Sequence, residues 1–122
     1  MKRDLDLVRE ILFAVEENAG NPLGSVELNI ENHSQQELSY HIMLLDQAGL
    51  IRAEDCSVLG PEGFRWEAKH LTWEGHEFID AARDSTTWKK AKKKVADAAG
   101  GVIFSVLKDV LVAWARQSAF SG

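Results

Sequence analysis

Two short phrases constrain the fold of this chain more than any other feature. The first is YHIMLLDQAGLI at residues 40–51, and the second is LTWEGHEFI at residues 71–79. The pattern indicates a helix that runs into Ala-Gly-Leu-Ile, then two strands, then a further helix that opens with Leu-Thr-x-x-Gly. This order is typical of a winged helix-turn-helix domain. We therefore expect an α+β, mostly helical fold with a winged helix-turn-helix-like core and a two-stranded wing.

The elements before the wing follow from apolar periodicity and capping residues. Residues 4–18 carry apolar side chains at helical spacing, and Asp4 is placed to cap that helix. Residues 25–31 alternate apolar and polar side chains, which predicts a half-buried strand. Ser34 opens a Ser-x-x-Glu capping box for the next helix, which ends at Gly49 and takes the recognition-helix position. The support helix that usually precedes it is therefore short or missing.

The wing and the helices after it have equally local signals. Residues 51–58 and 64–71 read as two strands joined by a Gly-Pro-Glu-Gly turn. Thr72 is placed to cap the helix that follows the second strand. A break at residues 84–86 separates this helix from a lysine-rich helical stretch that runs to about residue 98.

The remainder of the chain, residues 85–122, is expected to follow a winged-helix-like domain at residues 1–84. The apolar arc of residues 102–119 is too wide for a helix that lies singly on a solvated surface. Lys108 and Asp109 at its centre disfavour a membrane span. This C-terminal helix packs on the core or mediates oligomerisation. We expect a homo-oligomer, with a dimer favoured and these interface candidates: Ile103, Phe104, Leu107, Val110, Leu111 and Trp114.

The charge distribution bears on DNA as a partner. Residues 1–57 have a charge balance of −7 and residues 58–122 a balance of +2, within a net charge of −5. Nonspecific DNA affinity comes from phosphate neutralisation by Lys and Arg, so an acidic N-terminal half is unfavourable for it. The recognition helix also lacks Lys and Arg, the residues that most often contact guanine. The candidate nucleic-acid contacts are Gln36, Tyr40, Arg65, Lys69, Lys89, Lys90, Lys92, Lys93 and Lys94.

The five clustered lysines have a simpler interpretation, which is a solvated helical face that keeps an apolar oligomer soluble. A membrane-surface role is the least favoured of the three interpretations. Tyr40 on an exposed helix face equally suits protein recognition.

The sequence gives no support for catalysis, a metal or a cofactor. The four histidines are scattered and fit no zinc-binding spacing, so we expect structural roles for them. Cys56 lies in a predicted wing strand without a neighbouring base, and no glycine-rich phosphate loop is present. A single cysteine and the absence of a secretory signal favour a reducing, cytoplasmic location.

With these residues laid out, the chain resembles a family found in bacteriophages and bacterial genomes that is catalogued as a domain of unknown function. The matching segments are residues 1–9, 40–51, 71–78 and 88–94, and together they span nearly the whole chain. The resemblance implies a winged-helix-like core and a phage or prophage setting. It implies no catalytic residues.

Two hypotheses about function follow. In the first, the chain is a phage-type accessory protein that is nucleic-acid-associated or regulatory and acts as an oligomer. Arg65, Lys69 and the lysine cluster would contact phosphates, with Gln36 and Tyr40 nearest the bases. In the second, it is a module that binds a host or phage protein through its acidic surface and tail helix, without binding DNA. A structural role in a phage particle ranks third and an enzyme fourth.

Overall fold

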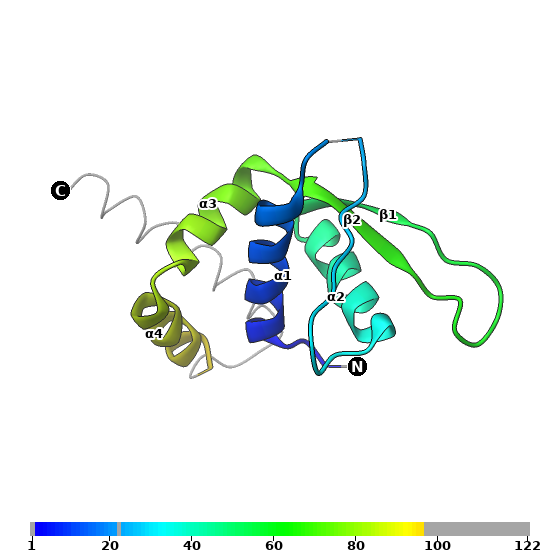
Figure 1. The fold of residues 1–122 in the computed structure, drawn as a ribbon. Coiled ribbons are helices and arrows are strands. Elements are labelled where there is room, and N and C mark those ends of the chain that lie inside the picture. The colour runs from blue at the N-terminus through cyan, green and yellow to red at the C-terminus, as the bar shows by residue number, and fades with distance from the viewer. Residues whose placement is uncertain (1, 22, 97–122) are drawn as a thin grey trace. The chain divides into compact units, whose positions relative to one another are not determined.

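The α+β fold expected from the sequence is confirmed in the computed structural model, which describes residues 2–21 and 23–96 (Figure 1). The layout is consistent with that of a winged-helix domain. In chain order the elements are α1 (Leu5–Asn18), α2 (Gln35–Gln47), β1 (Ile51–Asp55), β2 (Trp66–Leu71), α3 (Trp73–Ala82) and α4 (Ser85–Ala96). The predicted tail helix at residues 102–119 lies outside the described residues.

The chain divides into two compact units, residues 1–76 and 77–122. Helix α3 begins in the first unit and ends in the second. The division predicted after residue 84 stays a prediction.

Helix α1 begins where its capping residue predicts. The Asp4 carboxylate accepts hydrogen bonds from the backbone N–H groups of Asp6 and Leu7, at 3.0 and 3.2 Å. These bonds satisfy two of the amide groups that have no partner within the first turn of a helix. The helix buries a single apolar face, which consists of Leu7, Val8, Ile11, Leu12 and Val15.

The strand predicted at residues 25–31 is not formed as a strand. Val26 makes an isolated bridge to Ala68 of β2, in which the Val26 N–H donates to the Ala68 carbonyl at 2.7 Å. The alternation of burial is real, because Val26 and Leu28 are buried while Glu27 is exposed. An alternating pattern reports which side chains are covered, not whether the backbone has a partner strand. Among the described residues between α1 and α2 there is no helix, as the sequence indicated.

Helix α2 packs against the rest of the first unit through Leu38, Ile42 and Leu45. The Ser34 hydroxyl caps it by accepting the Glu37 N–H at 3.0 Å. Gly49 has a φ of 78°, the left-handed conformation that glycine supplies at a helix C-terminus.

Strands β1 and β2 pair antiparallel, with Ile51 opposite Leu71 and a register shift between Arg52 and Ala53. The Ala53 N–H at this irregularity donates to the Asp46 carboxylate of α2 at 3.0 Å. Beyond β1, the Cys56 N–H donates to the Arg65 carbonyl at 2.8 Å, so the hairpin continues toward the wing tip.

The sequence segments at residues 40–51 and 71–79 meet in space. The Thr72 hydroxyl donates to the Gly49 carbonyl at 2.6 Å and accepts the Gly75 N–H at 3.1 Å, and the Thr72 N–H donates to the Leu50 carbonyl at 3.0 Å. Gly75 lies so close to Leu50 that a Cβ there would be 1.9 Å from the Leu50 carbonyl oxygen. The end of α2, the start of β1, the end of β2 and the start of α3 are therefore joined at one place.

The second unit contains two buried aromatic side chains. Phe78 of α3 and Trp88 of α4 are buried and meet edge to face, with ring centroids 6.2 Å apart. Asp84 caps α4, because its carboxylate accepts the Thr86 N–H at 2.8 Å.

We predict that Gly75→Ala destabilises the protein, because the added methyl group would overlap the Leu50 carbonyl and the backbone would have to shift. The expected loss is about 1–3 kcal/mol or more in the free energy of unfolding. Urea unfolding followed by far-UV circular dichroism measures it. Gly20→Ala is the matched control, since a Cβ at Gly20 meets nothing within 4 Å. Equal stability of the two variants would contradict the close contact.

Candidate binding face

The α2–wing face consists of the N-terminal half of α2 and the hairpin of residues 51–71. The Gln36 side-chain amide of α2 donates to the Pro61 carbonyl of the hairpin at 3.3 Å. Gln36 and Tyr40 are both partly exposed on α2, as expected for the recognition-helix position. The structure therefore brings Gln36 next to the wing.

The two cations predicted to contact phosphates from the wing are paired with carboxylates of the same hairpin. Arg65 lies 2.9 Å from Glu67, and Lys69 lies 3.4 Å from Glu54. The Lys69 ammonium also donates to the Leu23 carbonyl at 3.3 Å. Exposed ion pairs add little stability. They nevertheless place a carboxylate beside each of these two cations, which reduces the positive potential that a phosphate would meet there.

Glu67 is the centre of a small polar cluster on this hairpin. Hydrogen bonding from the Ser25 hydroxyl lowers the pKa of the Glu67 carboxyl, and contacts with Cys56 and Arg65 lower it further, while partial burial opposes them. Burial and the neighbouring Glu67 charge raise the pKa of the Cys56 thiol. A raised pKa keeps Cys56 in its unreactive thiol form, which fits a structural role.

A groove of about 1110 Å³ lies between residues 25–29, α2 and the wing side of the hairpin. Its floor includes the apolar residues Val26, Leu28, Leu38, Ile42, Phe64 and Trp66. Three carboxylates, those of Glu27, Glu62 and Glu67, line it together with a single cation, Arg65. The groove is thus apolar at its base and acidic at its rim.

The wing tip exposes apolar side chains. Val58 is 73% exposed and Leu59 is fully exposed. Val58 and Leu59 adjoin the turn predicted before Phe64, but the sequence pattern assigned them no role, and it did not identify Phe64 and Trp66 as groove residues. The available signal was two adjacent aliphatic residues before a Gly-Pro turn, a place where polar residues are usual.

The predicted lysine cluster lies on α4, in the second unit. Lys89, Lys90 and Lys93 are exposed. The ammonium group of Lys92 lies 5.8 Å from the centroid of the Trp88 ring, so its stem covers that buried aromatic side chain. The side chain of Lys94 lies outside the described residues. The oligomer-interface candidates between Ile103 and Trp114 also lie outside them.

The His, Cys, Asp and Glu side chains of the described residues are too scattered to form a metal site. Residues 2–21 and 23–96 contain no group of three His, Cys, Asp or Glu side chains that could hold a metal ion. His70 and His76 line a small hollow of about 330 Å³. No helix in the same ranges is long and apolar enough to cross a membrane.

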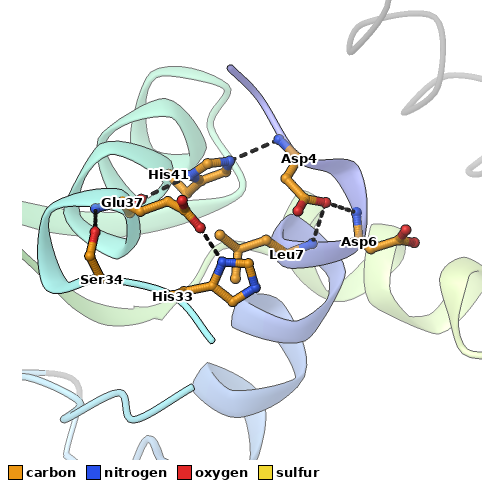
Figure 2. A network of polar contacts seen from close by, with 7 residues as sticks. All are labelled: Asp4, Asp6, Leu7, His33, Ser34, Glu37 and His41. Atoms are coloured by element: carbon orange, nitrogen blue, oxygen red, sulfur yellow. Dashed lines mark hydrogen bonds and ion pairs between the residues drawn. The ribbon is translucent and has the colours of Figure 1, made fainter. Parts of the chain in front are cut away.

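Two of the histidines join α2 to its surroundings (Figure 2). His41 is fully buried, and its Nε2 accepts the Asp4 N–H at 2.9 Å. Its Nδ1 must then carry the proton, which it donates to the Glu37 carbonyl at 2.8 Å. The neutral ring thus joins the capping residue of α1 to the first turn of α2. The structural role expected for this histidine is confirmed.

The Glu37 carboxylate pairs with the His33 ring instead of completing the predicted capping box (Figure 2). This hydrogen bond is the main reason that the pKa of His33 is raised above its usual 6.5. A raised pKa means that the folded state binds the proton more tightly than the unfolded state does.

We predict that Glu37→Gln lowers the pKa of His33, measured by NMR titration of its ring protons. In the unaltered chain the contribution of this pair to stability is fully present below pH 6.5 and is lost as the pH rises through the raised pKa. Glu31→Gln, which changes an exposed carboxylate near the same turn, should leave the titration unchanged. An unaltered His33 titration in Glu37→Gln would contradict the pairing.

Comparison with known proteins places the chain in a family. It is 33% identical over 110 residues to a protein of Haemophilus influenzae (strain Rd) described as uncharacterized, which covers 90% of this chain and 92% of that protein. No solved structure matches the present chain significantly. The family described as hypothetical protein DUF2513 matches residues 2–102, in agreement with the resemblance seen in the sequence. The chain belongs to the DUF2513 family of proteins.

Proposed function

We propose that the chain is a protein-binding module that uses the α2–wing face and does not act as an enzyme. One observation carries the proposal. The wing presents Val58 and Leu59 to solvent on a face where two of the three cations, Arg65 and Lys69, are paired with carboxylates. Exposed aliphatic side chains within a polar surround suit the centre of a protein interface.

The charge of the same face supports a protein partner over DNA. Helix α2 has two acidic residues and neither Lys nor Arg. The hairpin of residues 51–71 has three basic and four acidic residues. A surface of this balance releases few counterions from DNA, and counterion release provides most of nonspecific affinity.

Affinity capture from a lysate of the source organism tests this function. The immobilised protein should enrich a defined protein partner, identified by mass spectrometry. Val58→Ser combined with Leu59→Ser should reduce that enrichment at least about tenfold, as expected when central apolar contacts are removed. Leu23→Ser is the control, because Leu23 is 85% exposed but lies outside the wing. Enrichment that is absent, or equal in both variants, would contradict the proposal.

Nucleic acid is the second candidate partner, and the exposed lysines Lys89, Lys90 and Lys93 on α4 favour it. This alternative predicts binding to a labelled random-sequence duplex that weakens by orders of magnitude between about 50 and 200 mM salt. Replacing the three lysines with glutamine should remove it. Our primary proposal expects fluorescence anisotropy to detect no duplex binding at the lower salt concentration.

Self-association through the apolar stretch at residues 102–119 is a further part of the proposal, and it rests on the sequence. A homo-oligomer would present several copies of the α2–wing face, which raises avidity without new contacts. The phage or prophage setting implied by the family resemblance fits a small accessory protein of this kind.

A further inference from the structure

Strand β2 has one edge that is only partly covered. The Cys56 N–H donates to the Arg65 carbonyl, so the backbone of Arg65 faces β1. Backbone groups of successive residues in a strand point to opposite sides, so the N–H and C=O of Trp66 face away from β1. The next residue on that side, Ala68, accepts the Val26 N–H. In the described part of the chain, no strand pairs with this edge at Trp66.

The groove of the α2–wing face lies along this uncovered edge. Val26 is beside Ala68, and the chain then leaves β2 on its way to α2 (Figure 1). The groove is lined by Phe64 and Trp66 on one side and by residues 25–29 on the other. Natural proteins usually cover or charge a strand edge because it can pair with another chain. Here Val26 covers the edge at Ala68, and the edge at Trp66 opens into the groove.

The side chains around the groove define what could occupy it. Phe64, Trp66 and Ala68 are every second residue along this strand, so their side chains lie on the same face. Ala68 is buried on that face. An added strand would place every second side chain against this apolar face. The rim carries three carboxylates and one cation, and that cation, Arg65, is already paired with Glu67. The complementary ligand is an extended segment in which apolar and basic residues alternate.

We propose that the groove binds an extended, basic segment of a partner protein, which adds to β2 as an extra strand beside Trp66. This inference rests on the proposed function and specifies the binding mode. Backbone hydrogen bonds would provide affinity, while the apolar floor and the acidic rim would select the sequence.

The test uses the full chain and a fluorescein-labelled peptide of alternating lysine and valine, with binding followed by anisotropy. Two further peptides are N-methylated, one on its valine and one on its lysine backbone amides. Amides of successive residues point to opposite edges of a strand, so the valine amides of this peptide all face one edge and the lysine amides all face the other. N-methylation should therefore weaken binding more than about tenfold in one of these peptides and leave the other close to the parent.

Charge variants test the location. Glu27→Lys combined with Glu62→Lys reverses two exposed rim carboxylates and should weaken binding of the parent peptide roughly tenfold. Glu10→Lys combined with Glu17→Lys makes the same change in net charge on exposed residues of α1, away from the groove. This control should stay within about twofold of the unaltered protein.

Several results would overturn the inference. These are a parent peptide that does not bind, two methylated peptides that bind equally well, and a rim variant that binds like its control. A dimer by light scattering that the rim variant dissociates would assign the groove to a second copy instead. The proposed function is judged separately by capture that depends on Val58 and Leu59, so either proposal can fail while the other stands.

Discussion

The arrangement of the first unit depends on the hydrogen bonds of Thr72, which lies where α2, β1, β2 and α3 meet. Its hydroxyl donates to the Gly49 carbonyl in the turn that ends α2 and accepts the Gly75 N–H in the first turn of α3. Because its backbone N–H also bonds Leu50, one residue fixes the chain on both sides of the hairpin. Without this junction the hairpin would be held at its base mainly by the pairing of β1 with β2. The close contact of Gly75 with Leu50 leaves no room for any other residue in that turn.

The position of the α2–wing face depends on this junction. The junction fixes the base of the hairpin, and the Asp46 carboxylate fixes the amide at its register shift. The hairpin therefore leaves the core in a defined direction, with Trp66 and Phe64 beside the groove. Charge pairing within the hairpin then decides what this face can attract. The carboxylates of Glu54 and Glu67 offset two of the three basic side chains of the hairpin, and α2 adds acidic residues without any Lys or Arg, so the face carries a net negative charge.

Local signals predicted much of the fold because they depend on neighbouring residues. Asp4, Ser34 and Thr72 cap their helices as their sequence positions indicate, and Gly49 has the expected positive φ. The prediction of a strand at residues 25–31 failed because pairing needs a partner at the right distance, and the partner is remote in sequence. Within residues 25–31, Val26 alone forms a backbone bridge with β2.

The candidate site was less predictable, for the same reason. Arg65 and Lys69 were correctly placed on the wing, but their pairing with Glu67 and Glu54 depends on the hairpin geometry. The groove is formed by segments far apart in the chain, and no local pattern reports it. Glu37 has the spacing of a capping box, yet its carboxylate pairs with the His33 ring. A sequence pattern indicates which groups lie near the carboxylate, but not which of them forms the hydrogen bond.

The exposed tip of the wing has a consequence for how such proteins diverge. Residues 57–62 are all exposed, and the tip contacts α2 through the Gln36–Pro61 hydrogen bond. Substitutions there change little buried surface, so they leave the stability of the junction nearly unaffected. Under the proposed function, Val58 and Leu59 of this chain could therefore be exchanged to suit another partner while the scaffold keeps its stability.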